Sequence, residues 1–450
     1  MGDAAFSPSP RRLGRSAARP RPAAEEAGLL DRFVDYLPTV LFYTLIVPAG
    51  ISFSIGDFLL FAYRALLILA LPFLLFYFAR RRHRLMLPDM LLIAGLLWMG
   101  VSFVYNLGLL SGLEATGGTG IDMVGAYLIG RVCIRDERDL ARFLKLILPG
   151  LLLVGAVLVV ESLTGRLWIA SIFPIQSTFE GGTDYQYRLG LLRAFGPFQH
   201  AILGGLIMAS FLTLYLMLER NPLRRAFGIG AALAGFFTLS SAAIASLALQ
   251  AALHLYRWGM KLAGFRNNWW ALFWAAVICI AMLELVSENG AVSVIIRYAA
   301  LNPATGSYRL LIWDYGTANV ASNPLFGIGY EEYERAAWMT GSVDNHWLAV
   351  AIRHGLPALV PLLAMPLALI VRLAIISNRL PSVAGVPYAA FMIALFSFTA
   401  MGITVAYWTA ALAFFYFLVG CSAALVELYD KRVALAARHR SEMRHAAQSQ

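Results

Sequence analysis

The sequence predicts an all-α, polytopic integral membrane protein, a helical bundle of about twelve transmembrane helices with two long loops on one side. Hydrophobic residues make up 60% of the 450 residues and charged residues only 14%, whereas soluble domains carry roughly 25% charged residues. Apolar runs of the length needed to cross a bilayer recur along the chain. Because these runs are unbroken, they do not resemble the short alternating strands of a β-barrel.

Twelve apolar segments are candidate membrane spans. They are residues 37–55, 57–79, 87–107, 119–134, 141–162, 199–218, 223–240, 242–257, 269–287, 346–377, 387–405 and 407–428. Asp122 and Arg131 interrupt the fourth segment, and the tenth is long enough to contain a break at Gly355. We therefore expect one membrane domain over residues 35–428.

The basic residues predict the orientation of the spans. Clusters of Arg and Lys lie in the amino-terminal tail, in five connections between spans and in the carboxy-terminal tail, and cytoplasmic loops collect these residues. With twelve spans, all clusters fall on one side if both termini are cytoplasmic. The net charge of +10 therefore reflects membrane orientation and not nucleic-acid binding. We expect a disordered basic tail at residues 1–34 and a second basic cytoplasmic tail at residues 429–450.

The opposite side receives two long loops, residues 163–198 and 288–345, which lie in the periplasm of a bacterium with an outer membrane. Six arginines in these loops run against the orientation bias, namely Arg166, Arg188, Arg193, Arg297, Arg309 and Arg335. An anionic ligand on this side is the simplest explanation. Residues 303–357 also form a polar, aromatic and Gly-rich region, which places titratable groups at the mouth of a membrane helix.

Several motifs occur in and around this region in a fixed order. Arg309 is followed one helical turn later by Trp313, an Asn-Pro-Leu-x-Gly-x-Gly turn follows at residues 323–329, and an Asp-Asn pair at Asp344 precedes Gly355-Leu356. A further motif, an Arg followed by Gly-x-Phe and a polar pair at the start of a span, occupies residues 193–200. Together these motifs resemble the signature region of the O-antigen ligase and O-antigen polymerase superfamily of membrane glycosyltransferases. The resemblance implies a GT-C-like bundle.

Two departures from the family pattern affect the expected activity. The position of the reactive His in ligases holds Asp344 here, with His346 two residues later, and the segment 239–242 lacks the Arg of a Ser-Arg pair that many relatives have. An Asp at that position is more typical of polymerases than of ligases.

The resemblance thus implies a bacterial inner-membrane glycosyltransferase that polymerises undecaprenyl-diphosphate-linked repeat units into O-antigen or exopolysaccharide at the periplasmic face. The first alternative is an O-antigen ligase, which transfers the finished glycan to lipid A core or another acceptor. An alternative of another class is a flippase or transporter of lipid-linked oligosaccharides. A scaffold subunit whose site has decayed is a third.

The family reaction requires stabilisation of the leaving diphosphate and activation of an acceptor hydroxyl. Arginine binds phosphate oxygens bidentately and stays charged, so Arg193, Arg309 and Arg188 are expected to bind the substrate diphosphate. Asp344 or His346 is expected to be the catalytic base. Because residues two apart on a helix lie about 200° apart, both face one pocket only if the helix starts after Asp344.

Four further residues are expected to bind sugar or to be structural: Trp313, Asn345, Trp347 and Tyr330. Asn345 is also a preferred helix cap. No metal or other cofactor is expected, since arginines supply the positive charge, and Cys133, Cys279 and Cys421 have no metal-ligand spacing. The expected partners are the undecaprenyl-diphosphate-linked oligosaccharide, a glycan or lipid A core acceptor and membrane lipids. A chain-length regulator and a flippase are further candidates.

Overall fold

The computed structural model of the protein describes residues 29–55, 58–81, 83–174, 186–265, 268–287, 290, 294, 303–381 and 383–448. These residues are mostly helical. Most of the amino-terminal tail and Arg297 lie outside the described residues, as do parts of both long loops.

The elements follow one another as a series of helices with two short hairpins. The first half holds α1 (Leu29–Leu45), β1 (Ser52–Ile55), β2 (Phe58–Phe61), α2 (Ala62–Arg80), α3 (Leu87–Leu107), α4 (Leu109–Gly120), the π-helix η1 (Ile121–Gly125), α5 (Ala126–Cys133), α6 (Glu137–Thr164) and α7 (Trp168–Ile172). The second half holds β3 (Tyr187–Arg188), β4 (Leu191–Leu192), α8 (Ala201–Leu218), α9 (Pro222–Leu233), the 3₁₀ helix η2 (Ala234–Thr238), α10 (Ser241–Leu262), α11 (Trp269–Val286), α13 (Pro303–Ser322), α14 (His346–His354), α15 (Leu356–Arg379), α16 (Val386–Met401) and α17 (Thr409–Gln448).

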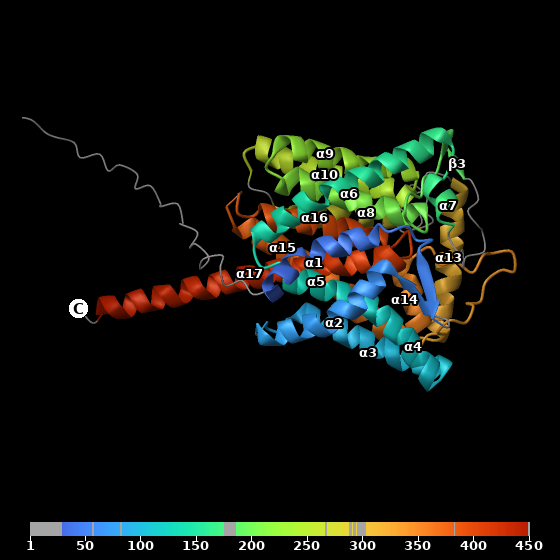
Figure 1. The fold of residues 1–450 in the computed structure, drawn as a ribbon, viewed down its shortest axis with the longest axis horizontal. Coiled ribbons are helices and arrows are strands. Elements are labelled where there is room, and N and C mark those ends of the chain that lie inside the picture. Colours follow the sequence, from blue (N-terminus) through green and yellow to red (C-terminus); the bar gives the residue numbers. More distant parts are fainter. Residues whose placement is uncertain are drawn as a thin grey trace, which may run out of the picture.

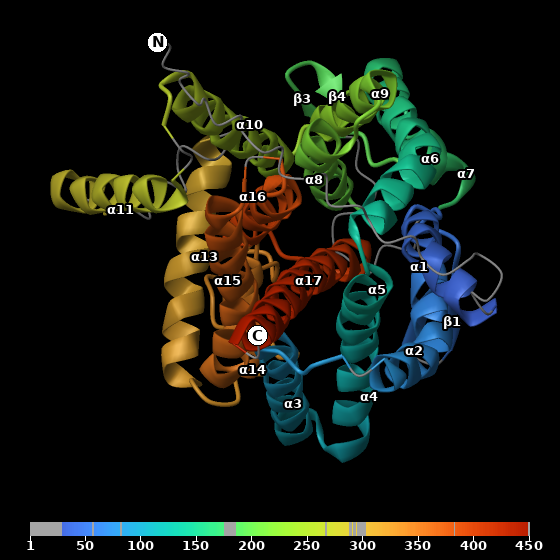
Figure 2. The same cartoon turned by 90° about the vertical axis from the view of Figure 1, so that its left-hand side faces the viewer.

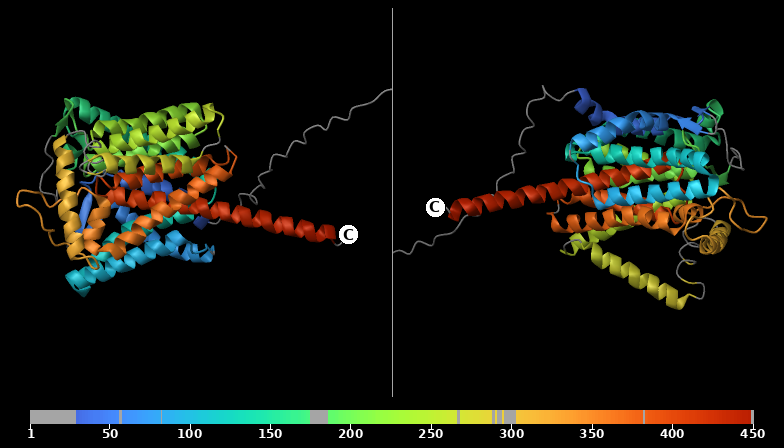
Figure 3. Two further views of the ribbon diagram at one scale, coloured as in Figure 1. Left: turned by 180° about the vertical axis from the view of Figure 1, so that it is seen from behind. Right: turned by 90° about the horizontal axis from the view of Figure 1, so that it is seen from below.

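Most of the helices run side by side along the long axis of the molecule, and α13 lies across one end of them (Figure 1). The centre of the bundle is α17, in which every residue from 411 to 427 is buried, as expected for a helix that is apolar on all sides. Beyond the bundle, α17 continues as an exposed helix at the end opposite α13 (Figure 3). In contrast, α11 projects from the bundle with most of its apolar surface exposed (Figure 2).

Seven described helices are long and apolar enough to cross a membrane: α2, α3, α6, α8, α11, α15 and α17. The apolar α16 is shorter. This agrees with the expected helical membrane protein, whereas the number of twelve spans stays a prediction.

The first predicted span differs from the structure, whereas the break expected in the tenth is present. The first was predicted to continue to residue 55, but α1 ends at Leu45 and residues 52–55 pair antiparallel with residues 58–61, with Ser52 opposite Phe61. Pro48 and Gly50 between them are residues that interrupt helices. The tenth predicted span is divided at Gly355 into α14 and α15, which confirms the expected break.

The charged residues that interrupt the fourth predicted span are both paired. In η1, Asp122 accepts hydrogen bonds from Arg64 of α2. In α5, Arg131 is fully buried and contacts the carboxylates of Asp89 in α3 and Glu427 in α17. Ionisable groups within a membrane domain are generally paired in this way, so the charges do not exclude a membrane segment here.

These two ion-pair groups mark opposite ends of the bundle. Arg64 lies in the first turn of α2, whereas Arg131 donates a hydrogen bond of 3.1 Å to the carbonyl of Arg84, which follows the last turn of α2. The described parts of both long loops, including α7, β3 and α13, lie together at one end (Figure 1). A small second core between α13 and α14, which includes Ile312 and Ile352, holds this end together.

Candidate functional site

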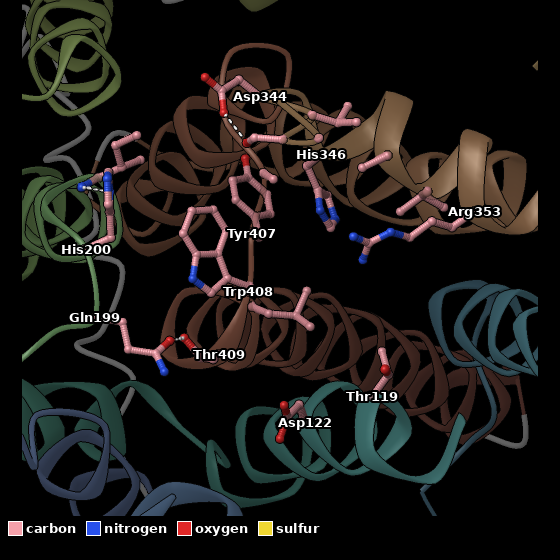
Figure 4. Close-up of a pocket in the computed structure, with 18 of the residues that line it drawn as sticks. Thr119, Asp122, Gln199, His200, Asp344, His346, Arg353, Tyr407, Trp408 and Thr409 are labelled. Carbon is pink, nitrogen blue, oxygen red and sulfur yellow. Dashed lines mark hydrogen bonds between the residues drawn. The ribbon is translucent and has the colours of Figure 1, made fainter. Parts of the chain in front are cut away.

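A cavity of about 760 Å³ lies at the α13 end of the bundle, within the size range of small-molecule sites. Segments far apart in the sequence line it. They are the β3–β4 hairpin, the starts of α8 and α10, α13, the loop before α14, α14 itself, residues 406–409, and parts of α2 and η1. Figure 4 shows His346, Arg353, Tyr407 and Trp408 directed toward the same open space.

Three predicted diphosphate ligands, Arg188, Arg193 and Arg309, line this cavity together. Arg193 is 4% exposed and Arg309 is 8% exposed. Nevertheless, Nε and Nη1 of Arg309 and Nε of Arg193 have no hydrogen-bond partner among the described residues. Because buried polar groups are nearly always hydrogen-bonded, these free donors indicate a ligand with acceptor oxygens.

Neighbouring groups fix the positions of the arginines. Nη1 of Arg193 donates a hydrogen bond to Oε1 of Gln186, and Nη1 of Arg188 donates one of 3.1 Å to the carbonyl of Leu239. Burial and, to a smaller extent, Arg188 lower the pKa of Arg193 to about 10, and Asp344 opposes this change. Arg193 therefore remains a cation at neutral pH, and the cluster offers concentrated positive charge.

Asp344 lines the same cavity and lies just outside the helix. It is partly exposed, and Ser342 Oγ donates a hydrogen bond of 3.1 Å to its Oδ1. The helix cap is Asn345, whose Oδ1 accepts from the backbone N of Leu348 at 3.0 Å. Because α14 starts at His346, the carboxylate of Asp344 is free of capping and shares the cavity with the imidazole.

His346 is held more tightly than Asp344. Its backbone N lies 2.7 Å from the carbonyl of Gly402 and 3.0 Å from that of Val405, and its ring stacks on Tyr407 at a centroid distance of 4.4 Å. Burial, and to a smaller extent Arg353, lower the pKa of His346 to about 3. The ring is thus neutral at physiological pH and accepts a proton only weakly.

The four residues expected to be sugar-binding or structural lie in different surroundings. Tyr330 is 55% exposed and lines the cavity. Trp313 packs against the small core between α13 and α14. Trp347 belongs to the main core and donates from Nε1 to the carbonyl of Thr399 at 3.0 Å, and Asn345 is the cap of α14. The positions of Trp313, Trp347 and Asn345 are those of structural residues.

Glu161, which the sequence analysis did not single out, organises the turn that follows Arg193. It is fully buried at the end of α6 and accepts hydrogen bonds from the backbone N of Ile169 (3.1 Å), Phe195 (3.0 Å) and Gly196 (2.8 Å). The sequence did contain a signal for this role. Glu161 lies at the end of a predicted span, where a carboxylate needs a partner because its environment is apolar.

The Asn-Pro-Leu-x-Gly-x-Gly turn holds the carboxy-terminal end of α14. Gly327 and Gly329 adopt φ of +61° and +63°, a conformation that favours glycine. The backbone N of Ile328 donates to the carbonyl of Ile352 at 2.9 Å, and that of Gly329 donates to the carbonyl of Arg353 at 3.0 Å. The turn thereby satisfies carbonyls that a helix end leaves free and fixes the last turn of α14.

The polar pair of the 193–200 motif, Gln199 and His200, also lines the cavity together with Thr409, although the sequence assigned none of the three a role. Nδ1 of His200 accepts from the backbone N of Ile202 at 3.1 Å, and burial with the nearby arginines lowers the pKa of His200 to about 4. Thr409 donates to Oε1 of Gln199 at 2.9 Å, which ties the start of α17 to the start of α8. The motif at residues 193–200 was the available signal for Gln199 and His200, whereas Thr409 gave none that separated it from an ordinary polar residue at a helix start.

Within the described ranges, no three or more His, Cys, Asp or Glu residues are grouped to hold a metal ion. Neither a protein-family model nor a curated protein matches this chain. The cavity offers a ligand a cluster of arginines, one partly exposed carboxylate and a neutral imidazole.

Proposed function

We propose that the protein is a bacterial inner-membrane glycosyltransferase that polymerises undecaprenyl-diphosphate-linked repeat units into O-antigen or exopolysaccharide at the periplasmic face. The observation that carries the proposal is the shared cavity of Arg193, Arg309 and Asp344, in which both buried arginines keep unpartnered donors. The two segments that resemble the superfamily, residues 193–200 and 307–356, both contribute residues to this cavity.

Arg193, Arg309 and Arg188 bind the diphosphate of the donor in this proposal. Arginine forms paired hydrogen bonds to phosphate oxygens, and donors that are already in place cost no reorganisation when negative charge develops on the leaving group. Because both Arg193 and Arg309 are buried, water screens their charges little. The cluster therefore stabilises the diphosphate as it leaves with its lipid carrier.

Asp344 is the favoured base. The acceptor hydroxyl attacks the anomeric carbon, its proton passes to the carboxylate of Asp344, and the bond from the anomeric carbon to the diphosphate oxygen breaks. A single displacement of this kind inverts the anomeric configuration. His346 is less suited because it is 7% exposed and its ring is stacked on Tyr407, whereas the carboxylate of Asp344 is partly exposed in the cavity.

The transporter alternative predicts cationic side chains along a passage through the bundle. The cationic residues of the cavity lie instead at the α13 end of the bundle. Even Arg64, which comes from α2, lies in the first turn of that helix. At the other end of α2, Arg131, Asp89 and Glu427 form a buried ion-pair group. This arrangement favours a reaction at one face over passage across the membrane.

A deletion strain tests the proposal through its surface polysaccharide, separated by size and by attachment to lipid A core. Loss of a polymerase leaves single repeat units on the lipid carrier, and Arg309→Gln or Asp344→Asn fails to restore polymer. Full-length polymer that accumulates on the carrier identifies the ligase alternative. Repeat units retained on the cytoplasmic side identify the flippase alternative, and an unchanged profile contradicts all three.

A further inference from the structure

The cavity contains a second group of charges on the side formed by α2, η1 and the end of α14. Arg64 binds Asp122 through two hydrogen bonds, from Nε to Oδ1 at 2.9 Å and from Nη2 to Oδ2 at 2.5 Å. The charges of this pair offset each other. Arg353, which lines the same cavity, is the remaining cation of this group.

Arg353 faces the cavity without a counterion. It is exposed, although its helical neighbours Ile352 and His354 are only 3% and 4% exposed. Figure 4 shows its guanidinium directed into the open space beside His346. No carboxylate lies within ion-pair distance of Arg353 in the part of the chain that the structure describes. The guanidinium is therefore accessible to a ligand that enters the cavity.

The surroundings of Arg353 fix its position. Its guanidinium lies 5.6 Å from the centroid of the Tyr330 ring, which in turn packs on Phe103 at 4.9 Å. The carbonyl of Arg353 accepts hydrogen bonds from the backbone N of Gly329 at 3.0 Å and from Ser102 Oγ at 3.2 Å. A cation held by a rigid backbone and an aromatic face loses little freedom when it binds an anion.

Arg353 is distinct from the arginine cluster of the proposed donor site. Arg193 is influenced electrostatically by Arg188 and Asp344, whereas Arg353 acts on His346 and Tyr330. In Figure 4, Asp344 and Arg353 lie on opposite sides of the His346 ring. The cavity thus has two cationic regions, and the proposed base Asp344 lies beside the one formed by the arginine cluster.

We propose that Arg353 is the centre of a second oxyanion site, which binds a negatively charged group of the acceptor while Arg193 and Arg309 bind the donor diphosphate. This proposal rests on the proposed function and names a feature of its second substrate. Guanidinium binds phosphate and carboxylate oxygens alike. The group is either the diphosphate of a second carrier-linked chain or the carboxylate of an acidic sugar.

Binding measurements on the full-length protein in lipid nanodiscs distinguish these sources. The probes are undecaprenyl diphosphate and methyl glucuronide, titrated by calorimetry into wild type, Arg353→Gln and Arg353→Met. The methionine variant keeps an apolar side chain against Tyr330, so it is expected to fold even if the glutamine variant does not. Arg166→Gln is the matched control, because Arg166 lies in a long loop against Trp168 and does not line the cavity.

A diphosphate source predicts two equivalents of undecaprenyl diphosphate for wild type and one for either Arg353 variant. A carboxylate source predicts one equivalent for all proteins, together with methyl glucuronide binding that weakens at least tenfold in the variants. Unchanged binding of both probes in a folded Arg353 variant overturns the second site. Because binding needs no turnover, the two proposals can fail separately. If wild type binds a probe and the Arg353 variants lose that binding, while wild type forms no polymer, only the proposed function is contradicted.

Discussion

Asp344 and His346 are two positions apart and line one cavity, yet they differ as acid–base groups. The carboxylate is partly exposed beside the arginine cluster, whereas the imidazole is 7% exposed and stacked on Tyr407. Burial disfavours the charged form of the imidazole, whereas the carboxylate is open to a ligand that enters the cavity. The local surroundings therefore assign the base more clearly than the residue types do.

Replacement of the proposed base tests this assignment. Asp344→Asn keeps the size of the side chain but cannot take up the proton, so we expect polymer formation to fall by about 10² to 10⁴ with undecaprenyl diphosphate binding retained. The measurement is the initial rate of polymer formation in nanodiscs. Asp314→Asn, at an exposed position of α13 away from the cavity, is expected to keep the wild-type rate. An active Asp344→Asn variant would exclude this residue as the base.

The buried His346 predicts a pH dependence of stability. Its pKa is about 3 in the folded protein against roughly 6.5 in an unfolded chain. Below pH 6.5 the unfolded state therefore binds more protons, and the free energy of unfolding decreases by about 1.4 kcal/mol per pH unit.

At pH 4 this loss reaches about 3 kcal/mol for the single residue. Thermal unfolding in detergent between pH 7.5 and pH 4 measures it. The variant His346→Gln, which cannot be protonated there, is expected to lose less stability over that range than wild type does. If the free energy of unfolding falls equally with decreasing pH in both proteins, His346 is not buried as a neutral group.

At the scale of elements, the end of α14 depends on the glycines of the preceding turn. A Cβ at Gly327 would lie 2.4 Å from the carbonyl oxygen of Ile352, and φ there is +61°. The turn and the helix end are therefore fitted to each other through their backbones, and neither has a flexible side chain at the contact that can move aside.

Gly327→Ala is expected to lower the free energy of unfolding by about 1–3 kcal/mol and to reduce anion binding, because Arg353 is attached to the same helix end. Thermal unfolding and probe binding measure the two effects. Gly117→Ala in α4, where an added Cβ meets nothing within 4 Å, is the control and is expected to be neutral. Equal stability of the two variants would contradict the proposed fit.

Locally encoded elements were predictable from the sequence. The break at Gly355 follows from a Gly that precedes Leu356 and Pro357, and the capping role of Asn345 follows from its residue type. The pairing of β1 with β2 was missed because short apolar segments do not distinguish strand from helix. The sequence left open whether Trp313 binds sugar or is structural, because its packing against a core depends on contacts between distant segments.

At the scale of the whole molecule, buried ion pairs join helices that are distant in the sequence. Arg131 connects α5 to Asp89 of α3 and to Glu427 of α17, which is 296 positions away. Glu161 holds backbone groups 34 and 35 positions away. The sequence shows such charges as interruptions of spans, but it gives no distance between them, so their partners could not be predicted.

Removal of Arg131 leaves two buried carboxylates without their shared cation. Arg131→Met is therefore expected to lower the free energy of unfolding by about 3–5 kcal/mol, seen as a lower unfolding temperature and a lower yield of folded protein. Arg372→Gln is the matched control, because its pair with Asp430 is 2.9 Å long but nearly half exposed and contributes at most about 1 kcal/mol. Comparable losses in both variants would contradict a stabilising role of the buried group.

The cavity volume of about 760 Å³ has a consequence for the product. Water occupies about 30 Å³ per molecule in the liquid, so the empty cavity has room for on the order of 25 water molecules. In the proposed reaction, the donor and acceptor ends displace this water, because any that remains beside the base competes for the anomeric carbon and releases free glycan. On this proposal the same space admits only the sugars next to the reacting bond. The polymer would then extend outside the cavity from its first addition, and a feature outside the cavity would have to set its length.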